Sequence, residues 1–125
     1  MTPTIILTDV RTRLSDIENW GAFSLVDGKK HCLLGAILVG AGNDPIDLGN
    51  HAAYNLFETE QTLKDVVGFV HQAMWNLMPY KADSLKSTSQ YMTVSFVNDY
   101  VKTVMKDHDM LMNILDESIR LANAA

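Results

Sequence analysis

Cysteine is almost absent from this chain, whose 125 residues include one, Cys32. A single thiol can form no disulfide bond within the chain and cannot supply a four-cysteine zinc site. Histidine provides no pair at a metal-ligand spacing, since the four imidazoles are those of His31, His51, His71 and His108. The sequence therefore indicates no bound metal ion and no cofactor, and its thiol content is typical of a reducing cytosol.

Positive charge is also scarce. The chain has 10 Lys and Arg residues against 15 Asp and Glu residues, a net charge of −5. Because a nucleic-acid-binding protein needs a basic face for phosphate contacts, this balance argues against nucleic acid as a partner. No Lys or Arg occurs between Lys30 and Lys64, where four acidic residues stand: Asp44, Asp47, Glu58 and Glu60. These four form either a solvated helix face or a surface patch for a basic protein partner.

Long apolar runs are missing as well. The longest one, residues 32–42, is far shorter than the ~20 residues that cross a bilayer. Residues 1–9 lack the basic start and the apolar stretch of a secretory signal. We therefore expect a soluble, cytoplasmic protein with no membrane partner.

Apolar residues are nevertheless frequent and periodic. They make up 47% of the chain, enough for one core, and we expect residues 1–125 to form a single globular domain. The spacing of amphipathic helices recurs over residues 2–20, 47–57, 59–78, 89–105 and a last segment capped by Asp107 or Asp109. Residues 32–41 are apolar on nearly every side, which indicates a buried helix, and the polar segment 80–89 is typical of a loop.

A hairpin signal interrupts the helices. The dipeptide Asp27-Gly28 favours a tight turn between two short strands. After it, Gly35 and Ala36 lack bulk, so neighbouring helices could approach closely. The predicted fold is mainly α, a compact bundle of five or six helices with one short β-hairpin near residues 22–31.

Cys32 stands where the predicted hairpin meets the buried helix. Unpaired N–H groups at a helix N-terminus can lower the pKa of a thiol, which would make Cys32 a nucleophile. His31 or His51 would then act as the base, and Asn98 or Asp99 would orient it. The alternative is that Cys32 packs in the core as a small apolar side chain.

Methionine is concentrated in the C-terminal half, which contains Met74, Met78, Met92, Met105, Met110 and Met112. Methionine fills irregular gaps in cores and also builds pliable surfaces that accept varied partners. The Met-rich half is therefore either ordinary core or a second candidate contact surface.

Several short motifs carry a resemblance to a known family. They are Asn19-Trp20-Gly21-Ala22, Asp27-Gly28, Cys32-Leu33-Leu34-Gly35-Ala36-Ile37, Phe96-Val97-Asn98-Asp99 and the segment from Leu115-Asp116 to Ile119. With them the chain resembles, over most of its length, the small, mostly helical bacterial and phage proteins grouped as domain of unknown function 6197. The chain departs from the family pattern at Val97 and in the additional segment 100–106. The resemblance implies a helical fold, and the family brings no established activity.

The resemblance also implies that Trp20, Cys32, Asn98 and Asp99 are anchors that meet in space beside the hairpin. One arrangement is a small ligand pocket that contains a thiol, an amide and a carboxylate. In the other, Asn98 and Asp99 are polar caps that hold helix ends and the backbone of the hairpin.

No complete catalytic constellation accompanies these features. The sequence therefore favours a non-catalytic accessory or interaction module that binds a protein partner or a small ligand, through the acidic region 44–60 or the Met-rich half. One alternative is a small cysteine-dependent hydrolase or transferase that uses Cys32. Another is a homo-oligomeric structural or virion-associated protein, since surplus apolar helix faces bury against copies of themselves.

Overall fold

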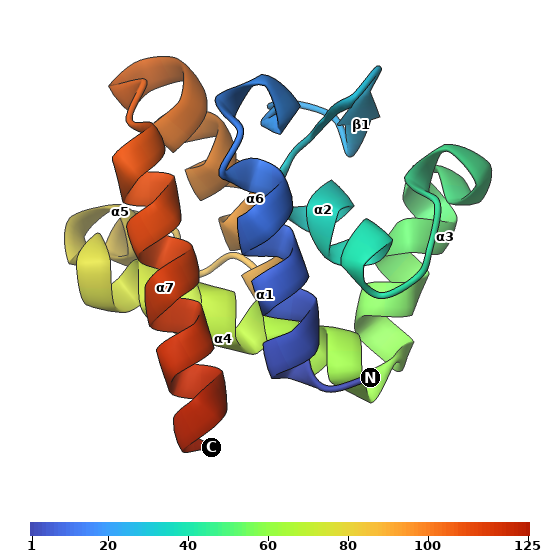
Figure 1. Ribbon diagram of the computed structural model, residues 1–125. Coiled ribbons are helices and arrows are strands. Elements are labelled where there is room, and N and C mark those ends of the chain that lie inside the picture. The colour runs from blue at the N-terminus through green and yellow to red at the C-terminus, as the bar shows by residue number, and fades with distance from the viewer.

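A computed structural model describes the backbone of residues 1–125 and every side chain except that of Ala82. Along this chain there are seven α-helices: α1 (Pro3–Leu14), α2 (Leu33–Gly40), α3 (Pro45–Thr59), α4 (Gln61–Leu77), α5 (Pro79–Ser84), α6 (Gln90–Tyr100) and α7 (His108–Ala124). The shorter elements are a 3₁₀ turn η1 (Ile17–Asn19), a π-helical turn η2 (Val101–Met105) and the strands β1 (Val26–Asp27) and β2 (Lys30–His31). The predicted mainly α fold with one short hairpin is confirmed (Figure 1).

Helix α1 is shorter than the predicted segment 2–20. It ends at Leu14, and Ser15 is its C-cap. The carboxylate of Asp16 then accepts a hydrogen bond from the Glu18 N–H at 3.0 Å and begins the separate turn η1. A local side-chain cap thus competes with continuation of the helix.

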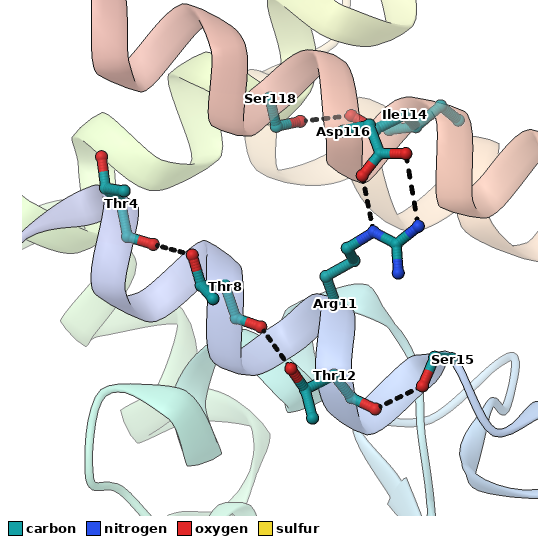
Figure 2. A network of polar contacts seen from close by, with 8 residues as sticks. All are labelled: Thr4, Thr8, Arg11, Thr12, Ser15, Ile114, Asp116 and Ser118. Atoms are coloured by element: carbon teal, nitrogen blue, oxygen red, sulfur yellow. Dashed lines mark hydrogen bonds and ion pairs between the residues drawn. The ribbon is translucent and has the colours of Figure 1, made fainter.

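Helices α1 and α7 lie side by side and antiparallel, so both chain ends are at the same side of the molecule (Figure 1). The hydroxyls of Thr8, Thr12 and Ser15 donate to carbonyl oxygens about one turn earlier at 2.8, 3.0 and 2.7 Å (Figure 2). Arg11 instead reaches across to α7, where its Nε lies 2.5 Å from Oδ1 of Asp116. A second contact, from Nη2 to Oδ2 at 3.3 Å, makes the ion pair between the two helices bidentate.

Helix α4 is the central element of the core and contacts α1, α3, α6 and α7. Its buried side chains are those of Leu63, Val66, Val67, Val70, Ala73 and Met74. Leu77 falls within the helix predicted over residues 59–78, but it is 37% exposed because α4 ends there and the chain turns into α5. Within the described part of the chain, no helix has both the length and the apolarity needed to span a membrane.

The hairpin turn lies one residue later than predicted. Strand pairing places the turn at Gly28 and Lys29 rather than at Asp27-Gly28. Gly28 has a φ of 61°, a value that glycine adopts readily at the first turn position of a type II′ hairpin.

Gly35 allows the closest backbone approach in this region. A Cβ atom at this position would lie 1.8 Å from the carbonyl oxygen of Leu25. The expectation of close packing at Gly35 is therefore right, but the neighbour is the segment before β1 and not another helix. The start of α2 and the hairpin segment are in contact because residue 35 has no side chain.

The prediction of a loop over residues 80–89 is wrong at its beginning, where α5 forms. Pro79 suits the first position of a helix, since it has no N–H that needs a partner there. Helix α6 starts after Ser89, whose hydroxyl oxygen accepts from the Met92 N–H at 3.2 Å. One of the polar residues between these two helices, Ser89, is therefore the N-cap of α6.

Helix α6 continues into η2, which ends at Lys106 in a left-handed conformation with a φ of 51°. Asp107 then caps α7, and its carboxylate accepts from the Met110 N–H at 3.0 Å. Of the two predicted caps, Asp107 is therefore the cap and Asp109 lies in the first turn.

Candidate functional site

Asn98 is the centre of a buried hydrogen-bond network at the junction of α6, α2 and the chain that precedes the hairpin. Its side chain is 1% exposed. Oδ1 accepts from Nε1 of Trp20 at 2.9 Å and from the Leu33 N–H at 3.1 Å, while Nδ2 donates to the Gly21 carbonyl oxygen at 3.1 Å. Buried amides need such partners, and here both ends of the amide are engaged. Asn98 holds three backbone segments together.

Asp99 fixes the adjacent stretch of chain. Its Oδ1 accepts from the Phe23 N–H at 3.0 Å and from Nδ2 of Asn98 at 3.1 Å. Phe23 has a φ of 69°, a region that bulky residues rarely occupy, and its side chain is 78% exposed. Asn98 and Asp99 therefore act as polar caps, one at the start of α2 and the other beside the hairpin.

A cavity of about 240 Å³ lies next to this network, between α6, the start of α2 and residues 23–25. Cys32 and Asp99 are in its lining, together with Ser24, Leu25, Asn50, Tyr91, Met92 and Ser95 among others. Trp20 and Asn98 are each 1% exposed and lie outside the lining. The four predicted pocket residues thus divide into two that border the cavity and two that support it.

The thiol of Cys32 is 5% exposed and caps α2, with Sγ accepting from the Gly35 N–H at 3.5 Å. Burial raises the pKa of this thiol and outweighs the backbone hydrogen bonds from Gly35 and Leu34, which lower it. A raised pKa keeps the thiol protonated near neutral pH, whereas a nucleophilic cysteine needs the thiolate.

The two histidines predicted as bases are not in the lining of the cavity that Cys32 borders. His31 borders a different cavity of about 130 Å³ together with Arg13 and Asn19, and partial burial lowers the pKa of its imidazole. His51 is exposed on α3. Within the described structure, neither ring is hydrogen-bonded to Cys32. Nor do three or more His, Cys, Asp or Glu side chains gather among the described residues so that they could hold a metal ion.

The four acidic residues of the predicted partner surface are distributed over both ends of α3. Asp44 caps the helix, because its Oδ1 accepts from the Ile46 N–H at 2.9 Å, and Asp47 lies in the first turn, where the helix dipole favours negative charge. Glu58 is in the last turn and Glu60 follows the helix. All four are exposed. Asp44 and Asp47 therefore stabilise the start of α3. A kink at Gly49 separates them from Glu58 and Glu60.

A larger groove lies where α4, α5, η2 and α7 meet. Its volume is about 540 Å³, and its lining consists of Leu77, Met78, Pro79, Tyr80, Lys81, Ser84, Tyr100, Met105 and Met110. Tyr80 is 92% exposed at this groove, whereas Met74 belongs to the core. In the Met-rich half, Met74 is thus in the core, Met92 borders the smaller cavity, and Met78, Met105 and Met110 line the groove.

No protein-family model, curated protein or solved structure matches this chain. The resemblance to domain of unknown function 6197 therefore stays a prediction. The functional argument depends on the cavity and the groove themselves.

Sequence reasoning did not identify Tyr91 and Ser95 as cavity residues. They stand four residues apart and share one face of α6 with Asp99, so the spacing was available as a signal. Residues 23–25, which border the same cavity, are distant from them in sequence. A local pattern cannot show such a contact.

Proposed function

We propose that this protein is a non-catalytic interaction module that binds an amphipathic helix of a partner protein in the groove between α4, α5, η2 and α7. The observation that carries the proposal is the groove, about 540 Å³ of space between mainly apolar side chains. An amphipathic helix binds such a groove through side chains that recur every three or four residues. Between the two predicted contact surfaces, this proposal selects the Met-rich half over the acidic region.

The side chains of the groove suit this partner. Met78, Met105 and Met110 are unbranched and flexible, so they can adapt to different apolar groups. Tyr80 offers an exposed ring with a polar tip, and tyrosine is enriched at the centres of protein interfaces. Covering these groups stabilises a complex by about 25 cal/mol for each Å² of apolar surface removed from water, before the costs of association.

The charge of the groove favours an acidic partner. Lys81 is the one charged side chain among the described residues of its lining. Its Nζ lies 4.1 Å from the ring centroid of Tyr100, a cation–π contact at the edge of the apolar surface. A helix with a carboxylate beside its apolar face complements this charge.

The catalytic alternative has less support from the geometry. The thiol of Cys32 is buried with a raised pKa, and among the described residues neither predicted base is hydrogen-bonded to it. The homo-oligomeric alternative would use the same groove, so it is an outcome of the experiment below.

The experiment uses protein labelled with ¹³C at the methionine methyl groups and two helical peptides of equal length. Both peptides present the same leucine face, and one has glutamate and the other lysine on its flanks. We expect the glutamate peptide to bind more tightly and to shift the methyl signals of Met78, Met105 and Met110. The signals of Met74 and Met92, which lie outside the groove, should stay in place.

Two variants provide the matched control. Leu77→Asp introduces a charge into the groove and should weaken peptide binding by about tenfold or more. Phe96→Asp alters an exposed apolar residue outside the groove, 43% exposed against 37% for Leu77, and should leave binding unchanged. An equal loss in both variants contradicts the proposal. A dimer, seen by light scattering and dissociated by Leu77→Asp, would assign the groove to a second copy of the chain and overturn it.

A further inference from the structure

We propose that the cavity beside Asp99 is a second binding site, independent of the groove, and that it takes a small organic cation such as a primary amine. The cavity lies between α6, the start of α2 and residues 23–25. The carboxylate of Asp99 would hold the ligand through a charge-assisted hydrogen bond, which is about twice as strong as a neutral one.

Asp99 is oriented before any ligand binds. Its Oδ1 accepts from the Phe23 N–H and from Nδ2 of Asn98. Asn98 is itself buried and fixed by three further hydrogen bonds. Oδ2 of Asp99 forms no hydrogen bond with any described residue, so it is available to a ligand. A carboxylate that is already held in place loses little further freedom on binding.

The charge of the cavity selects a cation. Asp99 is the one Asp, Glu, Lys, Arg or His side chain among the described residues of the lining. Burial raises the pKa of Cys32 and the pKa of Tyr91, so both side chains stay neutral near neutral pH. A single negative charge in a partly enclosed cavity attracts a cation and repels an anion.

The size and the walls of the cavity indicate a small ligand. Its volume of about 240 Å³ is below the roughly 300–1,000 Å³ of pockets for drug-sized molecules. Phe23 and Tyr91 contribute aromatic rings, which attract ammonium groups. Ser95 and Asn50 add polar groups that have no hydrogen-bond partner among the described residues. These groups could orient a second polar atom of the ligand.

The backbone of Phe23 is a further sign of a site. Its φ of 69° is strained for an aromatic residue, and its ring is exposed where it borders the cavity. Such strain persists where the surroundings enforce it and is concentrated at ligand sites. Here the enforcing contact is the hydrogen bond from Phe23 to Asp99, the residue that would bind the cation.

The test is a titration with three probes of similar shape: benzylamine, which is cationic near neutral pH, benzyl alcohol, which is neutral, and benzoate, which is anionic. The backbone NMR signals of Phe23 and Asp99 report binding. We expect benzylamine to shift them with a dissociation constant about tenfold or more below that of benzyl alcohol, and benzoate to leave them in place. Equal affinities for the amine and the alcohol would overturn the role of charge. No shift with any probe would overturn the site.

Variants separate the carboxylate from the shape of the cavity. Asp99→Asn keeps an oxygen for the Phe23 N–H and should weaken benzylamine binding by about tenfold while leaving benzyl alcohol binding unchanged. Asp109→Asn makes the same change of charge at an exposed residue of α7 and should have no effect; an equal loss there would overturn the proposal. Ser95→Leu should fill the cavity and abolish binding of both probes. If Asp99→Asn does not fold, Ser95→Leu and the three probes still test whether the cavity binds a cation.

An ammonium group could come from a free amine or from a lysine side chain of another protein. Nα-acetyl-lysine amide distinguishes these sources, since its two amide groups add bulk to the same cation. We expect it to bind more weakly than benzylamine, because the cavity has only about 240 Å³. Tighter binding would assign the cavity to a lysine side chain and overturn its assignment to a small molecule.

Discussion

The indole Nε1 of Trp20 donates a hydrogen bond of 2.9 Å to Oδ1 of Asn98, although the two residues are 78 positions apart. The same oxygen accepts the N–H of Leu33, the first residue of α2. One side-chain amide therefore determines how α6 meets the start of α2 and the chain that leads into the hairpin.

Replacement of Asn98 should be strongly destabilising. In Asn98→Ala, the Trp20 indole N–H, the Leu33 N–H and the Gly21 carbonyl lose their shared partner in a buried place. Since each buried, unpaired group costs about 1–3 kcal/mol, we expect the free energy of unfolding to fall by about 3 kcal/mol or more. Equilibrium unfolding in urea measures this loss.

Asn113→Ala is the control for that substitution, because Asn113 is exposed on α7. It should change the free energy of unfolding by no more than about 0.5 kcal/mol. Similar losses of unfolding free energy in the two variants would show that the network around Asn98 does not stabilise the protein more than an exposed asparagine does.

Adding one methyl group at two glycines should have opposite effects. The Cβ of Gly35→Ala would lie 1.8 Å from the Leu25 carbonyl oxygen, so the backbone must shift, at a cost of about 1–3 kcal/mol. The Cβ of Gly68→Ala meets its nearest neighbour, Oε1 of Gln90, at an ordinary 3.7 Å. That change should stabilise α4 by up to about 1 kcal/mol. The melting temperature should fall in Gly35→Ala and rise in Gly68→Ala. A change in the same direction in both variants would contradict the packing described for Gly35.

The buried thiol should make stability fall at alkaline pH. In the unfolded chain a cysteine ionises near pH ~8.5, whereas burial raises the pKa of Cys32 in the folded protein. The contribution of the protonated thiol is therefore complete below that pH, declines above it, and is lost as the pH rises through the higher pKa of the folded protein. Cys32→Ser replaces the sulfur with a hydroxyl oxygen, which can cap α2 but does not ionise in this pH range.

Urea unfolding of both proteins at about pH 7 and about pH 9.5 tests this expectation. The free energy of unfolding of the unaltered protein should decline relative to that of Cys32→Ser at the higher pH. A difference that stays constant would mean that the thiol is as accessible to ionisation in the folded protein as in the unfolded chain.

The ion pair between α1 and α7 should contribute little despite its bidentate geometry. The side chains of Arg11 and Asp116 are 38% and 55% exposed, so water screens their attraction. A double-mutant cycle with Arg11→Ala and Asp116→Ala should give a coupling energy below about 1 kcal/mol, reduced further by salt. A coupling above about 2 kcal/mol would show that the pair acts as a clamp between the two helices.

The sequence predicts the periodic part of this fold well. The stripe from Leu63 to Met74 is buried on α4, and Asp107 caps α7, because both features depend on neighbours in the sequence. The helix predicted over residues 2–20 is too long, because Asp16 begins a competing turn. Local patterns thus give the helices more reliably than their ends.

The sites were less accessible to prediction. The family resemblance groups Cys32 with Asp99, and both border the same cavity. Phe23 is linked to the site by its strained backbone conformation, which no sequence pattern predicts. The groove combines Leu77 with Met110, residues from helices whose packing depends on contacts throughout the chain. Such combinations come from tertiary structure.

The pairing of α7 with α1 and α4 bears on the order in which the protein can fold as it is synthesised. Helix α7 buries Leu111, Ile114 and Leu115, and it contacts both earlier helices. Until residues 108–124 have left the ribosome, the apolar faces that α7 covers have no partner. A nascent chain at that stage is open to aggregation or to chaperones, and the fold closes only when α7 arrives.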